Sequence, residues 1–137
     1  MSDNSKIVDY FLKEIFHNEI SEGNDPDKVS YLISPEFSYY LNLGERQSFK
    51  EYAERVRMLN SSATVVVGKP SSDDDIHFHC DFEVKLPAPN QNTKILGFSQ
   101  IVIRNGLIQQ IEINYHKNQK EFDEFQKLMT DSSTVFL

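Results

Sequence analysis

Residues 94–115 constrain the fold of this chain more than any other segment, because two strand-like runs flank Asn105 and Gly106 there. A two-residue type I′ turn needs positive φ at both central positions, and Asn followed by Gly tolerates this best. The segment therefore predicts a tight β-hairpin. It follows a first half with helical spacing, so the chain combines helices with an antiparallel sheet.

Three helices are predicted in the first half of the chain. Apolar residues recur at three- and four-residue steps over residues 4–20, and a second helix over 26–33 ends before Pro35. Ser48 and Glu51 have the spacing of a capping box, so a third helix begins there. We assign five charged residues at this third helix to its solvated side: Glu45, Lys50, Glu54, Arg55 and Arg57.

The remaining segments are predicted to be strands, followed by one more helix. Residues 37–42 are rich in aromatic side chains, residues 63–68 contain consecutive valines, and residues 76–86 alternate between apolar and polar. Residues 118–129 show the spacing of a short amphipathic helix. The predicted order is α-α-β-α-β-β-β-β-α, an α+β fold in which helices cover one face of a bent antiparallel sheet.

Length and charge limit the classes of function. With 137 residues we expect one domain over 1–137, with a core at about 7–129 and a tail at 130–137. The net charge of −7 and the lack of a dense Lys/Arg cluster argue against binding to nucleic acid or to an anionic membrane. The single cysteine, Cys80, and the absence of a signal-like or membrane-spanning run lead us to expect a cytosolic protein.

The chain resembles the nuclear-transport-factor-2-like superfamily, which includes ketosteroid isomerase and the SnoaL-like polyketide cyclases. Three stretches carry the resemblance: LISPEFSYYLN after the second helix, the SFKEYAERV helix after a glycine, and the closing strands IVIRNGLIQQIEINY. The resemblance implies a cone-shaped sheet wrapped on the N-terminal helices, with a pocket inside the cone. It also implies a homodimer that forms through the outer face of the sheet.

Strand alternation and the resemblance together select the candidate pocket residues. The resemblance places Tyr40 at the carboxylate base of ketosteroid isomerase, Ser99 at its protonated acid, and Tyr10 or Phe11 at its tyrosine, so both carboxylates are missing here. We therefore name no catalytic residue. The ligand-pocket candidates are Tyr10, Phe11, Tyr40, Phe78, Cys80, Phe82, Ser99, Ile111, Ile113 and Tyr115.

Other chemistry-bearing residues have simpler explanations. Cys80 lies on the apolar side of its strand, which favours a packing role over a nucleophile. His77 and His79 share one strand face with Asp81, but a metal site needs three or four convergent ligands, so a solvated or interface face is favoured. Asp73, Asp74 and Asp75 read as a solvated turn. We expect no metal and no cofactor.

We expect a protein that binds a small, largely apolar molecule in the cone. An isomerase, cyclase or dehydratase is the alternative, in which Tyr40, Ser99, Tyr115 or His17 supplies acid–base groups. A third possibility is a module that binds another protein through the outer face of the sheet. A titratable group inside the cavity favours the enzyme, and a cone filled by side chains favours the interaction module.

Overall fold

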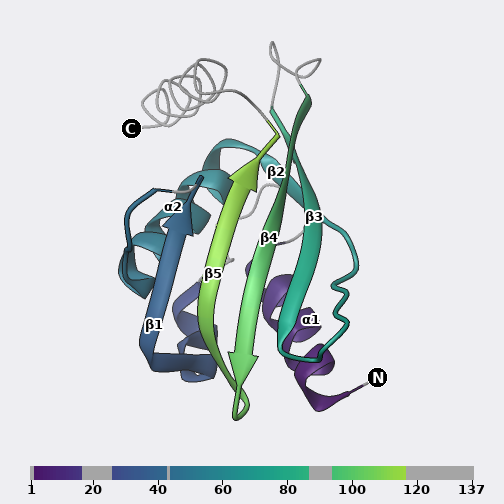
Figure 1. Ribbon diagram of the computed structural model, residues 1–137. Helices are drawn as coiled ribbons and strands as arrows, with labels where there is room; N and C mark the ends of the chain where they lie inside the picture. The colour runs from purple at the N-terminus through teal and green to yellow at the C-terminus, as the bar shows by residue number, and fades with distance from the viewer. Residues whose placement is uncertain (1, 17–25, 43, 87–93, 117–137) are drawn as a thin grey trace.

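The structure is a computed structural model that describes residues 2–16, 26–42, 44–86 and 94–116 (Figure 1). The predicted fourth helix at 118–129 and His17 lie outside these residues. The helical elements are α1 (Asp3–Ile15), the 3₁₀ helix η1 (Pro26–Leu32) and α2 (Phe49–Ser62). The strands are β1 (Ile33–Leu41), β2 (Thr64–Val67), β3 (His77–Lys85), β4 (Lys94–Arg104) and β5 (Leu107–Tyr115).

The five strands form one curved sheet in the order β1-β5-β4-β3-β2 (Figure 1). Strands β2 to β5 pair antiparallel, as expected for consecutive strands, while β1 pairs with β5 in parallel. The sheet is therefore mixed, because the first strand returns to the edge beside the last one. The order of elements confirms an α+β fold, and β1 extends the sheet that the hairpin closes.

The Asn-Gly hairpin is confirmed in its backbone. Asn105 and Gly106 have φ values of 55° and 76°, which are the two positive values that a type I′ turn needs. Strands β4 and β5 pair on either side of the turn from Arg104 and Leu107 up to Gly97 and Tyr115. The hairpin is therefore the centre of the sheet.

Three elements differ from those that the sequence predicts, two in a boundary and one in the type of helix. Helix α1 ends at Ile15, because Phe16 is extended, so it does not run to residue 20. The second helix is a 3₁₀ helix. Strand β1 begins at Ile33 and runs through Pro35. Proline is tolerated in β1 because this strand lies at the sheet edge and its register shifts between Ile33 and Ser38.

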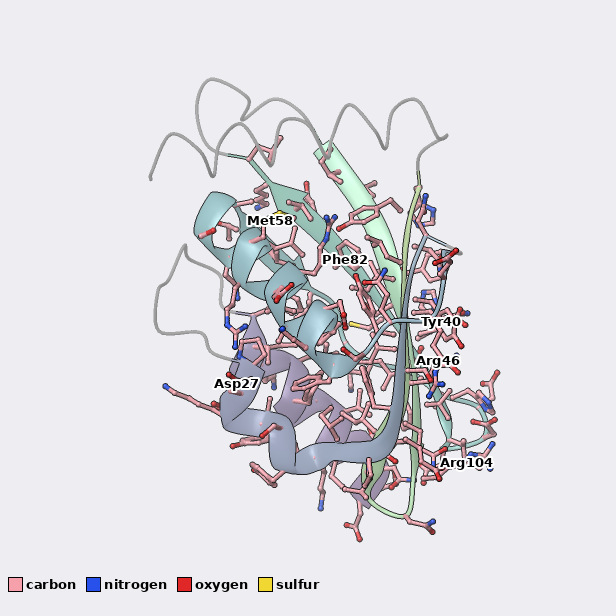
Figure 2. The ribbon with its side chains drawn as sticks, turned by 90° about the vertical axis from the view of Figure 1, so that its left-hand side faces the viewer. Asp27, Tyr40, Arg46, Met58, Phe82 and Arg104 are labelled. Atoms are coloured by element: carbon pink, nitrogen blue, oxygen red, sulfur yellow. The ribbon has the colours of Figure 1, made fainter. Side chains whose placement is uncertain are left out.

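The helices cover one face of the sheet, and this layer contains the core (Figure 2). Tyr52 of α2 is at the centre of an aromatic cluster, with Tyr39 at 5.3 Å and Phe49 at 5.9 Å between ring centroids. Phe11 and Phe37 also pack on Tyr52. In the described part of the chain, no helix is long and apolar enough to cross a membrane.

Helix α2 is fixed at both ends by polar contacts. At its start, the Glu51 carboxylate accepts hydrogen bonds from the backbone N–H and the hydroxyl of Ser48, as the capping-box spacing predicts. Near its end, Asn60 donates from Nδ2 to the carbonyl of Ile15 at 2.8 Å. This bond satisfies a terminal carbonyl of α1 and ties the two helices together.

Candidate functional site

A small cavity lies between the helices and the sheet, near the C-terminal ends of α1, α2 and β5. Seven residues line it: Phe16, Leu59, Val65, Phe82, Ser99, Ile113 and Tyr115. The centre of a water-sized sphere can move through about 10 Å³ of it, which is about what one water molecule needs. The described side chains therefore nearly fill the interior, and the wall is apolar except for Ser99 and Tyr115.

Arg55 brings a positive charge into this interior. It lies on α2 with only 7% of its surface exposed. Its Nη2 donates a hydrogen bond to the Tyr115 hydroxyl at 2.7 Å, and its guanidinium carbon lies 5.5 Å from the centroid of the Tyr115 ring. Burial raises the pKa of Tyr115, and the adjacent Arg55 charge opposes part of that effect. Arg55 was assigned to the solvated side of its helix, and that assignment is wrong.

Tyr39 adds a second phenol to the same region. It is 1% exposed, and its hydroxyl has no hydrogen-bond partner among the described residues. Burial raises the pKa of Tyr39 strongly, with the charge of Arg55 lowering it and Tyr115 raising it. Arg55 and Tyr115 therefore lie within electrostatic range of Tyr39. Of these three side chains, Arg55 and Tyr115 are in direct contact through their hydrogen bond.

Strands β4 and β5 carry the far wall of the cavity, and Gly97 lets the wall close. A Cβ atom at Gly97 would lie 2.6 Å from Cζ of Phe82 and 2.6 Å from the carbonyl oxygen of Asn114. The absence of a side chain thus allows the Phe82 ring to lie across β4. There the ring meets Tyr115 edge-on, with 5.5 Å between centroids.

Four of the ten predicted pocket residues line this cavity: Phe82, Ser99, Ile113 and Tyr115. Four others are buried elsewhere in the core: Phe11, Phe78, Cys80 and Ile111. The Cys80 thiol donates to the carbonyl of Gly68 at 3.2 Å, and burial raises its pKa to about 11. Such a thiol is protonated at neutral pH, which agrees with a packing role.

The last two predicted pocket residues, Tyr10 and Tyr40, lie away from the interior, so they do not line the cavity. Tyr10 is 45% exposed on the outer side of α1. Tyr40 points to the side of the sheet opposite the helices (Figure 2), and its neighbour Tyr39 points inward. Successive residues of a strand face opposite sides, so a shift of one residue exchanges the two tyrosines.

The outer face of the sheet is polar and aromatic. Phe98 stacks on His79 with 5.1 Å between centroids and tilts against His116 at 5.4 Å. His79 Nε2 lies 2.9 Å from an Asp81 oxygen, and His77 Nδ1 lies 2.6 Å from an Asp74 oxygen. Within the described residues, no three His, Cys, Asp or Glu side chains converge as metal ligands.

Comparison with solved structures identifies the class of fold. A designed protein with a curved β-sheet matches with a TM-score of 0.66 at 20% identity, over 98% of this chain and 99% of its own. A candidate SnoaL-like polyketide cyclase from Jannaschia sp. CCS1 matches with a TM-score of 0.65 at 10% identity, over 83% and 85%. A nuclear-transport-factor-2-like protein of unknown function from Cytophaga hutchinsonii has a TM-score of 0.61 at 10% identity, over 87% and 93%.

These matches show that the chain has the nuclear-transport-factor-2-like fold, in the form that SnoaL-like proteins share. No family model and no curated protein matches the sequence. At these identities the likeness concerns the fold alone, and two of the matches are designed proteins. The function must therefore be argued from the site.

Proposed function

We propose that this protein binds a small, largely apolar molecule inside the cone, with a polar end of that molecule at Arg55 and Tyr115. The apolar wall of the cavity supports this proposal, because it would bury the body of such a ligand. Tyr115 lies in that wall, and its hydroxyl accepts a hydrogen bond from Arg55 behind it. The fold supports it too, since the concave side of the sheet and the helices enclose the space.

The observation that carries the proposal is the buried guanidinium of Arg55. Moving a charged group out of water is costly, and well-packed apolar side chains at such positions are often at least as stabilising. Arg55 lies on the buried side of α2, between Tyr52 and Leu59, and its guanidinium donates to the Tyr115 hydroxyl. Because Tyr115 and Leu59 both line the cavity, this buried charge lies close to the place where the polar end of a ligand would bind.

The cavity has room for about one water molecule, and a cone filled to this degree also favours the interaction module, so binding of a small molecule requires a side chain to move. Phe16 and Phe82 are the large flexible side chains of the wall, and Phe82 lies directly against Tyr115. We propose that the Phe82 ring swings aside when a ligand enters. The aromatic cluster at Tyr52 stays in place, because it is packed on four other rings.

Binding fits the described cavity wall better than catalysis does. That wall contains no carboxylate and no imidazole in the part of the chain the structure describes, so acid–base chemistry would depend on Tyr115. Burial raises the pKa of this phenol, which makes it a poor general base near neutral pH. An isomerase, cyclase or dehydratase is therefore the second candidate.

A thermal-shift screen tests the proposal. Compounds would include small apolar acids, ketones, alcohols and amides, because a ligand of the native state raises the melting temperature by mass action. We expect hits that disappear in Ser99→Leu, which fills the cavity, and persist in Gln100→Leu, which makes a matched change on the outer face. The proposal fails if no compound raises the melting temperature, and also if Ser99→Leu leaves every hit unchanged.

We also propose that the outer face of the sheet packs against a second copy of the chain. Leu96 is 48% exposed there, next to the stacked rings of His79, Phe98 and His116. A hollow of about 220 Å³ between His77, Gln110 and Glu112 would receive a partner's side chain.

A cytosolic location stays a prediction that rests on the single buried thiol, and cell fractionation would check it.

A further inference from the structure

The outward-facing side chains of β3 change from imidazoles to carboxylates halfway along the strand. The imidazoles of His77 and His79 come first, and the carboxylates of Asp81 and Glu83 follow. The buried Cys80 lies midway between the two pairs. Reversing the direction of the strand therefore exchanges imidazoles for carboxylates. A second β3 laid antiparallel over the first would place each imidazole beside a carboxylate of the other copy.

Strand β4 has a second feature with the same midpoint. Leu96 is 48% exposed on its outer face. The hollow of about 220 Å³ is lined by Val102, further along the same strand. Across the sheet, Leu96 pairs with Glu83 at one end of the β3 pattern, and Val102 pairs with His77 at the other end. Between positions 96 and 102 the strand advances about 20 Å, at about 3.4 Å per residue.

A two-fold axis decides which of these groups meet in a dimer. In a two-fold interface the same patch is used by both copies, so every contact occurs twice. An axis that lies between the two sheets and crosses the strands at the level of Ser99 exchanges the position of Leu96 with that of Val102. Leu96 then faces the hollow of the other copy, and the two β3 strands run antiparallel over each other. An axis along β4 would instead place hollow against hollow.

Contacts within the chain leave room for pairs between copies. His79 Nε2 lies 2.9 Å from an Asp81 oxygen, and His77 Nδ1 lies 2.6 Å from an Asp74 oxygen. A carboxylate has two oxygens that accept several hydrogen bonds, and each imidazole has a second nitrogen. The Asp81 side chain is also 77% exposed. One contact within the chain therefore does not exhaust these groups.

We infer that two copies pack with Leu96 of each copy in the hollow of the other, and with the imidazoles of each β3 beside the carboxylates of the other β3. This inference rests on the dimer of the proposed function and adds how the two copies are arranged. His79 then lies opposite Asp81. His77 lies opposite Glu83, so none of these carboxylates meets another, which would be repulsive. The pattern on β3 and the hollow on β4 support the same arrangement independently.

Mixing two charge variants tests the inference. The acidic variant carries His77→Glu and His79→Glu, and the basic variant carries Asp81→Lys and Glu83→Lys. Alone, each variant would place like charges, or imidazoles and ammonium groups, against each other. We expect each to self-associate at least tenfold more weakly than the native chain in analytical ultracentrifugation. An equimolar mixture should recover dimers, because the new carboxylates of one variant face the new ammonium groups of the other.

A matched control changes charge away from the outer face of the sheet. Glu14→Lys with Glu54→Lys alters two exposed positions on α1 and α2, and it should dimerise like the native chain. Circular dichroism would show that all the variants are folded.

Cross-linking with bismaleimidoethane locates the leucine. A mixture of Leu96→Cys and Val102→Cys should cross-link, because these positions face each other in the inferred dimer. Neither variant alone should, since its two copies of the new thiol lie about 20 Å apart along the strand direction. The native chain, in which Cys80 is buried, is the control.

The outcomes separate this arrangement from the dimer itself. A native dimer whose charge variants do not recover dimers on mixing, or whose cysteine variants cross-link only with themselves, would overturn the arrangement and leave the proposed dimer standing. A native chain that stays monomeric at high micromolar concentration would overturn both.

Discussion

The buried hydroxyl of Tyr39 destabilises the folded protein, because it has no hydrogen-bond partner among the described residues. A buried hydroxyl without a partner costs about 1–3 kcal/mol relative to a hydrogen-bonded one, and the Tyr39 oxygen has none among the described residues. The ring itself is well placed, because it packs on Tyr52 with 5.3 Å between centroids. The ring and the hydroxyl therefore serve different purposes.

We predict that Tyr39→Phe leaves the free energy of unfolding unchanged or raises it by about 1 kcal/mol. The ring packing is kept and the unpartnered oxygen is removed. Chemical denaturation measures this, and Tyr115→Phe is the matched control, because it removes a hydroxyl that accepts a bond from Arg55 and should lower stability by about 1–2 kcal/mol. A clear loss of stability in Tyr39→Phe would show that its hydroxyl has a partner in the free protein.

Asp74 makes the fold sensitive to acid. Its carboxylate accepts hydrogen bonds from the backbone N–H groups of His77 and Ile76, and these bonds hold its pKa well below the usual range. A depressed folded-state pKa stabilises the protein above the unfolded value of about 3.9. That contribution is lost as pH falls from there toward the folded-state pKa.

Accordingly, we expect the urea midpoint to drop between pH 5 and pH 2, and to drop less in Asp74→Asn. The asparagine oxygen still accepts the backbone bonds, but it does not titrate. Asp73→Asn keeps the Asp74 carboxylate and should show the full drop. Equal slopes in the native chain and in Asp74→Asn would show that Asp74 does not carry this pH dependence.

The residues of the site could be predicted only in part. Phe82, Ile113 and Tyr115 follow from strand alternation, whereas Ser99 follows from the resemblance to the fold family. Arg55 was missed because its charge suggested solvent, although a position three after Tyr52 and four before Leu59 lies on the buried face of a helix. Tyr39 was passed over for Tyr40, although Phe37 and Tyr39 share one face by alternation. In both cases position was the better guide than residue type.

At the scale of elements, α2 is the helix that positions the site. It carries Arg55 and the cavity residue Leu59, and the capping box at Ser48 and Glu51 fixes where it begins. Arg55 donates to Tyr115 across the interior, so its position depends on where α2 lies. A substitution that loosens the start of α2 would therefore also shift Arg55 relative to Tyr115.

Ser48→Ala should lower the melting temperature by roughly 3–5 °C, because an unsatisfied helix start destabilises the element. Differential scanning calorimetry measures the change. Ser61→Ala at the other end of α2, where the hydroxyl donates to the carbonyl of Met58, is the control and should have a smaller effect. A larger loss in Ser61→Ala than in Ser48→Ala would contradict this account of the helix.

Elements were predictable where local rules act, and less so where the whole fold decides. The turn at Asn105 and the cap at Ser48 are local, and both are confirmed. The parallel pairing of β1 with β5 joins residues about 70 positions apart, such as Tyr39 and Ile111, and no local pattern specifies it. The end of α1 at Ile15 likewise involves a distant residue, because the Ile15 carbonyl accepts a hydrogen bond from Asn60 of another helix.

At the scale of the molecule, the two faces of the sheet differ in burial. The inner face is buried under the helices (Figure 2). The outer face exposes Leu96 and carries the stacked rings of His79 and Phe98. An apolar and aromatic surface of this kind is typical of an interface between proteins. We therefore expect two copies to pack through it.

Light scattering at micromolar concentration should give a mass near twice 15.9 kDa. Leu96→Glu should convert the protein to a monomer, because the substitution places a charge in the interface. Tyr31→Glu, at an exposed residue of η1 away from the sheet, should leave the dimer intact. A monomeric native chain would contradict the proposed dimer.

The central claim is that a small molecule binds inside the cone beside Arg55 and Tyr115. Methyl-resolved NMR during titration with 3-phenylpropanoate tests it most directly. We predict that the large chemical-shift changes fall on the cavity methyls of Leu59, Val65 and Ile113, with none at Leu96 on the outer face. Changes confined to Leu96 and its neighbours, or no changes at saturating concentration, would contradict the claim.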